Sequence, residues 1–250
     1  MKPSLSIEGK TAVITLNNPE SANRLTVDDL DTLQQHISEV NQNQDIGVLV
    51  IKSTGKYFCS GFDISSLDES AKEKSLLFEV VVNAIEDCRP ITIAAVQGGV
   101  YGGATDLVLA CDFRIGSQAA EMFMPAAKLG IHFYQRGLVR YVSRLGVDTA
   151  KRLLLTAEKI QSAEMKDIGF LTQLVKPEDL DSAIDKLIQQ LMVMAPLAIL
   201  GMKKHINRIA NNTLNVDELN QDIALAQNSE DLQEGRSAWA EKRAPVFKGR

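Results

Sequence analysis

Two short glycine-containing segments carry the residue types best suited to chemistry. They read FCSGFD (58–63) and VYGGATD (100–106), and each follows an apolar stretch that is typical of a strand. Glycine lets main-chain N–H groups approach a ligand, and two such groups on one carbonyl oxygen would form an oxyanion hole. Asp106 would then move a proton beside that oxygen. A purely structural role is the alternative, because glycine turns after strands are common in α/β proteins.

Several function classes are disfavoured by motif and charge. Neither segment matches GxGxxG or GK[ST], so no nucleotide phosphate site is predicted. A formal net charge of −5 gives no general attraction to nucleic acid or to an anionic membrane. No apolar run reaches the roughly 18 residues of a membrane span, and the N-terminal residues lack a secretory pattern. Three widely spaced cysteines are expected to be reduced thiols in a cytoplasmic protein, namely Cys59, Cys88 and Cys111.

The segments around the two turns alternate between strand and helix patterns. Apolar and β-branched runs predict strands at 11–16, 46–52 and 91–96, of which the second is expected to be buried. Apolar residues three and four apart predict amphipathic helices within 27–40 and 76–85. A further helix is expected to start in the second glycine turn and to cover about 101–112, followed by a short strand at FRIG (113–116). This alternation favours parallel βαβ units.

Beyond Gly146 the pattern becomes mainly helical, with one extended exception at 170–175. Helices are expected at 148–156, 162–168, 180–194, 196–210 and 216–242. The sequence therefore predicts an α/β core over residues 1–195 and a helical module over 196–250. Because the C-terminal helices carry apolar stripes that must be buried, we expect an oligomer.

Five segments in this order resemble the enoyl-CoA hydratase/isomerase (crotonase) superfamily, from about residue 5 to residue 250. They read VITLNNPESANRLT, FCSGFDISSL, AAVQGGVYGGATDLVLACDFRIG, MPAAKLGI and SEDLQEGRSAWAEKRAPVFKGR. The resemblance implies an α/β crotonase (ClpP-like) fold, a spiral of ββα units with a C-terminal trimerisation module, in a homotrimer or hexamer. It implies an acyl-CoA thioester whose carbonyl lies between the N–H groups of Phe62 and Gly103. It implies no metal and no cofactor beyond the CoA of the substrate.

The same resemblance assigns further site residues. The CoA moiety would lie against Arg24, Leu25, Ser60, Gly61, Asp63, Ile64 and Lys248. Beside the acyl pocket, His132 would replace a missing acid or activate water, with a packing role as the alternative. An aromatic residue of the methylmalonyl-CoA decarboxylase branch would correspond to Phe133, which aligns more directly, or to Tyr134, which has the hydroxyl. For proton transfer Asp106 is the first choice, and His132 and Tyr134 are the second.

The chain departs from the hydratase pattern at two positions. Family hydratases carry a Glu where this chain has Asp106, and a second Glu where MPAAKLG places Ala126. Since a methyl group can neither activate water nor protonate carbon, ordinary hydration is disfavoured. Double-bond isomerisation, decarboxylation of a malonyl-type thioester and thioester hydrolysis remain open. A non-catalytic acyl-CoA-binding protein is the rival from another class, and RNA binding is disfavoured by the acidic composition.

Overall fold

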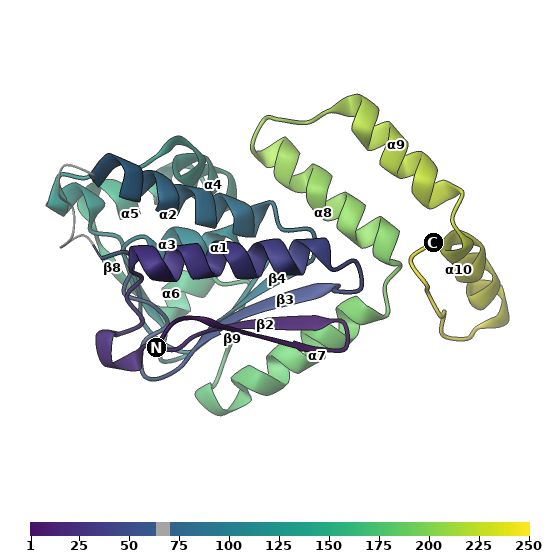
Figure 1. The fold of residues 1–250 in the computed structure, drawn as a ribbon, viewed down its shortest axis with the longest axis horizontal. Coiled ribbons are helices and arrows are strands. Elements are labelled where there is room, and N and C mark those ends of the chain that lie inside the picture. The colour runs from purple at the N-terminus through teal and green to yellow at the C-terminus, as the bar shows by residue number, and fades with distance from the viewer. Residues whose placement is uncertain (64–70) are drawn as a thin grey trace. The chain divides into compact units, whose positions relative to one another are not determined.

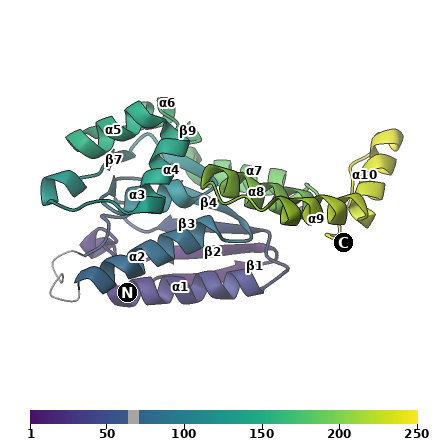
Figure 2. The same cartoon turned by 90° about the horizontal axis from the view of Figure 1, so that it is seen from above.

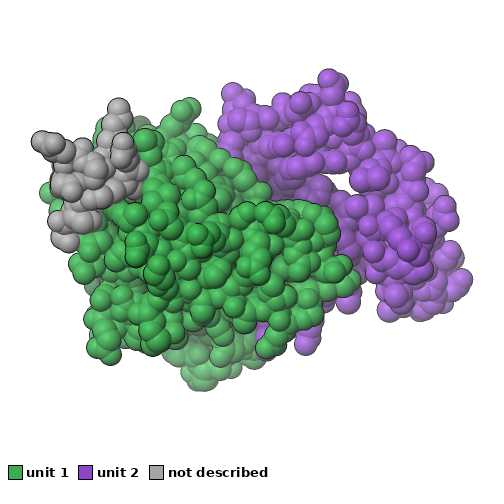
Figure 3. All heavy atoms as spheres, in the orientation of Figure 1, with its two compact units in different colours: residues 1–184 green, residues 185–250 purple. Residues whose placement is uncertain are grey.

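The computed structural model describes residues 1–63 and 71–250 (Figure 1). Its contacts divide into two compact units, Met1–Ile184 and Asp185–Arg250 (Figure 3). The division falls inside a helix, eleven residues before the boundary that the sequence predicts. Each unit is described by itself.

The first unit is built on a six-stranded sheet in the order β1-β2-β3-β4-β6-β9. The strands are β1 (Ser4–Glu8), β2 (Thr11–Leu16), β3 (Val48–Ser53), β4 (Ile91–Val96), β6 (Phe113–Ser117) and β9 (Gln173–Val175). Only β1 runs antiparallel to its neighbour, and all other pairs are parallel. Every residue of β4 is buried, including the polar Thr92, as is typical of a central strand covered on both faces.

Helices cover this sheet and carry the site. They are α1 (Val27–Gln42), α2 (Ala71–Glu86), α3 (Ala104–Ala110), α4 (Gln135–Leu145), α5 (Val147–Thr156) and α6 (Ser162–Asp167), with short 3-10 turns at η1 (Pro19–Ser21), η3 (Ala126–Leu129) and η4 (Pro177–Asp179). In both views α1 and α2 lie side by side along one face of the strands (Figures 1 and 2). Helix α1 begins with a capping box, in which Thr26 and Asp29 bond each other's main-chain amides.

The region of the second glycine turn differs from its prediction. The helix expected over 101–112 begins only at Ala104, because the short strand β5 (Val100–Tyr101) occupies its start. Strand β5 pairs with β7 (Glu121–Phe123), which pairs with β8 (Lys159–Gln161) in a separate three-stranded sheet. Strands of two or three residues are too short for a periodic pattern. Neither this sheet nor β1 was predicted.

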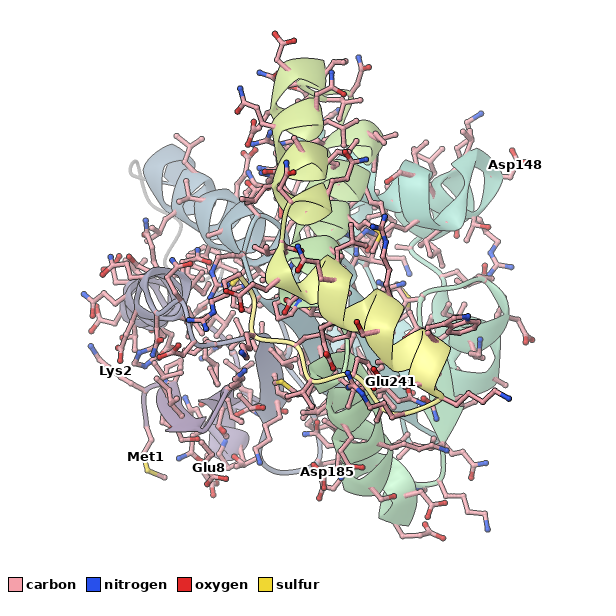
Figure 4. The ribbon with its side chains drawn as sticks, turned by 90° about the vertical axis from the view of Figure 1, so that its right-hand side faces the viewer. Met1, Lys2, Glu8, Asp148, Asp185 and Glu241 are labelled. Atoms are coloured by element: carbon pink, nitrogen blue, oxygen red, sulfur yellow. The ribbon has the colours of Figure 1, made fainter. Side chains whose placement is uncertain are left out.

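The second unit consists of helices. It contains the later part of α7 (Leu180–Met192), followed by α8 (Pro196–Ala210), α9 (Val216–Gln227) and α10 (Glu230–Glu241). Figure 4 marks Asp185, where the unit begins, and Glu241, where α10 ends. The helix expected over 216–242 is broken at Ser229, whose hydroxyl caps α10 by accepting a hydrogen bond from the Leu232 amide.

Across the described part of the chain, no helix taken singly combines the length and apolar character needed to cross a membrane. The bent pair Pro177–Met192 and Pro196–Ala210 meets those two criteria only when its members are taken together.

Candidate active site

The two glycine turns are in direct contact. Gly61 has a φ of +96°, and a Cβ placed on it would lie 2.8 Å from the Tyr101 carbonyl oxygen and 3.1 Å from the Gly103 amide nitrogen. A real side chain cannot be accommodated so close to backbone atoms, and this φ is itself strained for any other residue. Glycine at 61 is therefore what allows the second turn to approach the first.

Each turn contains a main-chain amide for which the described residues supply no hydrogen-bond acceptor, Phe62 in the first and Gly103 in the second. Leu25 bridges the first turn by donating to the Gly61 carbonyl and accepting from the Asp63 amide, both at 2.9 Å. This pairing directs the intervening Phe62 N–H away from Leu25, because successive groups of an extended chain face opposite sides. Gly103 precedes α3, whose first amides have no intrahelical acceptor. Within residues 1–63 and 71–250, neither the Phe62 nor the Gly103 amide donates a hydrogen bond.

Both oxygens of the Asp106 carboxylate accept hydrogen bonds. Its side chain is completely buried, one helical turn beyond Gly103, to whose carbonyl its amide donates at 3.0 Å. Arg140 donates from Nε to Oδ1 at 2.9 Å and from Nη2 to Oδ2 at 2.6 Å. The Tyr134 hydroxyl also donates to Oδ2. A bidentate guanidinium is the strongest pairing that a carboxylate makes, so Asp106 lies behind the Tyr134 hydroxyl as a fixed acceptor.

Tyr134 presents a phenol that stays protonated. It stands immediately before α4, and its ring stacks on Phe133 with centroids 4.8 Å apart. Burial raises the pKa of the phenol well above its usual value of about 10, and the negative charge of Asp106 raises it further. Tyr134 is therefore a neutral donor at physiological pH.

Sequence reasoning missed Arg140, which is fully buried. Its Nη1 donates to Glu86 at 2.9 Å and to Asn83 at 3.0 Å, both on α2. Arg136 and Arg144 also pair with Glu86, at 2.6 and 3.2 Å. The available signal was the recurrence of arginine every four residues in α4, which places all three on one face of the helix.

Helix α4 also holds the second glycine turn. The residue after Arg140 is Tyr141, which is fully buried and donates its hydroxyl to Thr105 Oγ1 at 2.6 Å. Thr105 in turn donates to the Gly102 carbonyl at 2.7 Å. Since Gly102 adjoins Gly103, two consecutive residues of α4 fix the carboxylate and the turn.

The other two candidates of the acyl region are placed differently. Ala126 begins the 3-10 helix η3 and is 8% exposed, packed within the core. His132 has an exposed side chain, and its Nδ1 lies 2.8 Å from the Phe133 carbonyl oxygen. The structure thus brings Tyr134, and not the imidazole of His132, to Asp106.

The residues assigned to CoA are spread over both units. Arg24 is half exposed and pairs with Asp63 at 3.5 Å. Leu25 is buried and contributes its main chain to the first turn, and the Ser60 amide donates to Ala22 at 2.9 Å. Lys248 belongs to the second unit, with an exposed side chain 3.8 Å from Glu230. Ile64 lies outside the described residues.

The Cys59 side chain forms hydrogen bonds that stabilise the first turn. Its thiol donates to the Asn23 carbonyl at 3.0 Å and accepts from the Gly61 amide at 3.4 Å. Burial raises the pKa of the thiol to about 12, so it is protonated under ordinary conditions. All three cysteines are free, in agreement with the reduced thiols that the sequence predicts, and all three are buried. Among the described residues, no three His, Cys, Asp or Glu side chains gather as a metal site.

Comparison with known proteins finds similarity to acyl-CoA enzymes along nearly the whole chain. The enoyl-CoA hydratase/isomerase family model matches residues 6–250. The peroxisomal Delta(3,5)-Delta(2,4)-dienoyl-CoA isomerase of Arabidopsis thaliana is 30% identical, over 94% of this chain and 91% of that protein. The methylmalonyl-CoA decarboxylase of Escherichia coli K12 is 27% identical, over 96% and 95%. An enoyl-CoA hydratase from Bacillus anthracis superposes with a TM-score of 0.90, at 26% identity and full coverage of both chains. The predicted crotonase fold is confirmed.

Proposed function

This chain belongs to the enoyl-CoA hydratase/isomerase family, and on that premise we propose that it decarboxylates a malonyl-type acyl-CoA thioester through an enolate. The observation that carries the proposal is the state of Asp106, which is buried with both oxygens bonded to Arg140 and one also to Tyr134. A carboxylate held in this way is poorly suited to take a proton from carbon. Decarboxylation is the family-type reaction that makes an enolate without a base.

In the first step the thioester carbonyl accepts hydrogen bonds from the Phe62 and Gly103 amides. The bond between the α-carbon and the substrate carboxylate breaks, CO2 leaves, and the electron pair of that bond becomes the enolate. The negative charge then lies on the oxygen between the two amides. Loss of one such donor costs about 10²–10³-fold in rate, which indicates how much this step depends on the two turns.

In the second step the Tyr134 hydroxyl gives its proton to the α-carbon, and water later restores the phenol. The net reaction consumes one proton and yields CO2 and the shortened acyl-CoA. The resting hydroxyl donates to Asp106, and Asp106 lies one helical turn after Gly103. This connection supports placing the hydroxyl near the proposed carbonyl site. Positioned proton transfer of this kind is worth about 10²–10⁴-fold.

Isomerisation is the second candidate. The observation in its favour is the direct contact of a hydroxyl with a carboxylate, Tyr134 with Asp106, which can pass one proton between two substrate carbons. The similarity to the dienoyl-CoA isomerase points the same way. Hydration is disfavoured since Ala126 supplies no second acid.

The CoA moiety and the assembly complete the proposal. We assign the CoA to Arg24, Leu25, Ser60, Gly61, Asp63, Ile64 and Lys248, with no metal or redox cofactor, in a cytoplasmic homotrimer or hexamer. Large apolar side chains of the second unit support association, because they are more than one-third exposed in the single chain, namely Met202, Ile206, Ile209, Ile223, Leu225 and Trp239. Sedimentation equilibrium tests this part.

The reaction is tested by offering malonyl-type, enoyl- and β-keto-acyl-CoA thioesters and reading the products by mass. Loss of CO2 from a malonyl-type thioester supports the proposal. Gain of a water by an enoyl-CoA refutes it, and a shifted double bond at unchanged mass replaces it with isomerisation. Tight thioester binding without turnover of any member of the panel identifies a non-catalytic binding protein and also refutes it.

A further inference from the structure

We propose that Arg140, held in place by Glu86, is a positioning residue that keeps Asp106 as a fixed acceptor and so orients the Tyr134 hydroxyl. This inference rests on the proposed function, in which Tyr134 supplies the proton. It concerns residues on α2 and α4 that lie outside the two glycine turns.

The geometry forms one continuous path from α2 to the phenol. Glu86 Oε2 accepts from Arg140 Nη1 at 2.9 Å, and the other two nitrogens of the same guanidinium reach the two oxygens of Asp106 at 2.9 and 2.6 Å. Asp106 then accepts from Tyr134. Since the guanidinium is planar and rigid, fixing one edge on Glu86 fixes the direction of the edge that faces Asp106.

Burial makes this arrangement specific to arginine. The side chains of Arg140 and Asp106 are 0% exposed, and that of Glu86 is 2% exposed. A buried ion requires compensation by charge and by hydrogen bonds. The cluster provides it, because Arg136, Arg140 and Arg144 face Glu86, Asp87 and Asp106. A lysine would preserve the charge of Arg140 but could not span both carboxylates with one planar group.

In the proposed reaction, the charge of Arg140 assists proton transfer from Tyr134. When Tyr134 loses its proton, the phenolate oxygen lies against the negative Asp106, which opposes the transfer. Arg140 offsets this repulsion, because its guanidinium carbon is 6.0 Å from the centre of the Tyr134 ring. The pKa of Tyr134 reflects the same balance: burial and Asp106 raise it, while Arg140 lowers it. Arg140 thus makes the phenol a better acid than the carboxylate alone would allow.

Arg136 provides a matched control. It lies four residues before Arg140 on the same helix and donates to the same Glu86 oxygen, but its other contacts are with Asp87 and not with Asp106. Its side chain is 30% exposed, so its removal leaves no dry cavity. Arg136→Gln therefore removes one arginine from Glu86 while it preserves the contacts of Asp106.

The test combines a spectroscopic and a kinetic measurement. The full-length protein is labelled with carbon-13 at tyrosine Cζ, and the Tyr134 resonance is identified among the four tyrosines by its loss in Tyr134→Phe. Arg140→Gln, Arg140→Lys, Glu86→Gln and Arg136→Gln are compared with the unmodified chain. The lysine variant keeps the charge balance and covers the case in which Arg140→Gln does not fold.

We expect the Tyr134 resonance to move in both Arg140 variants and to stay in place in Arg136→Gln. The kcat for thioester turnover should fall about 10²-fold in Arg140→Lys, as for a misplaced catalytic group, while KM changes less than about threefold. The kcat of Glu86→Gln should lie between those of Arg140→Lys and the unmodified chain. An unmoved Tyr134 resonance in folded Arg140→Lys overturns the inference. If no thioester is turned over, the proposed function fails, and the resonance still decides whether Arg140 orients Tyr134.

Discussion

Replacing Tyr134 with phenylalanine removes one oxygen and separates catalysis from stability. The ring can keep its stacking on Phe133, and Asp106 Oδ2 keeps the hydrogen bond from Arg140 at 2.6 Å. No buried acceptor is left without a partner, so the free energy of unfolding should fall by only about 1 kcal/mol. That corresponds to about 2–4 °C in Tm for a chain of this length. Loss of the proton donor should instead lower kcat about 10²–10⁴-fold, or about 2.7–5.4 kcal/mol in the barrier.

The assay follows release of CO2 from the thioester at saturating concentration, beside a thermal melt and a binding titration of the thioester. Tyr101→Phe is the matched control, because that phenol also donates to a carboxylate, that of Glu121 on the second sheet. It should keep its turnover. If Tyr134→Phe retains more than about one-tenth of kcat while it folds and binds normally, the phenol is not the donor and the reasoning is refuted.

Three other variants test the turns and the missing acid. Gly61→Ala places a methyl group against the Tyr101 carbonyl and should reduce kcat about 10²–10³-fold. Gly9→Ala, also at positive φ but in open space, should alter stability alone. Equal kcat in the two variants would show that the first turn has no role in turnover. Cys59 has a raised pKa of about 12 in the folded chain, so the folded state retains its proton longer than the unfolded state. The contribution of this thiol to the free energy of unfolding should therefore be fully present below about pH 8.5 and should fall by up to about 1.4 kcal/mol per pH unit above it. In urea titrations at pH 8 and 10, Cys59→Ala should lose less stability between the two pH values than the unmodified chain. An equal loss in both proteins contradicts the assignment. The Ala126→Glu variant should catalyse addition of water to an enoyl-CoA, detected by mass, while a variant with the exposed Ala127→Glu change should not. If neither variant hydrates the substrate, position 126 is not where the second acid of the hydratases acts.

The sequence predicts β2, β3 and β4 of the main sheet well because each has six residues, most of them apolar or β-branched. The runs at 11–16 and 91–96 coincide with β2 and β4. The three-stranded sheet was not predicted, since β5 has two residues and β7 and β8 have three. Their pairing depends on contacts between segments far apart in the chain. Local periodicity carries no information of that kind.

The candidate site could be located from the sequence, but the side chains that bind its carboxylate could not. Family resemblance pointed to Asp106 and Tyr134, while a fully buried Arg140 runs against the usual surface placement of arginine. The contact between Asp106 and Arg140 joins residues 34 positions apart, through the packing of α3 on α4. His132, which sequence reasoning ranked beside Tyr134, lies with its side chain exposed. Residue type alone could not separate these two neighbours.

The two departures from the hydratase pattern fit together once Arg140 is included. Asp106 is one methylene shorter than glutamate, and the guanidinium of Arg140 binds both of its oxygens. In the proposed reaction, proton transfer passes instead to the Tyr134 hydroxyl, which donates a hydrogen bond to this carboxylate. A second acid at 126 would be needed only to activate water, which decarboxylation does not require. Under this proposal, Asp106, Ala126 and Arg140 belong to one change of mechanism, in which the proton donor moves from a carboxyl group to a phenol.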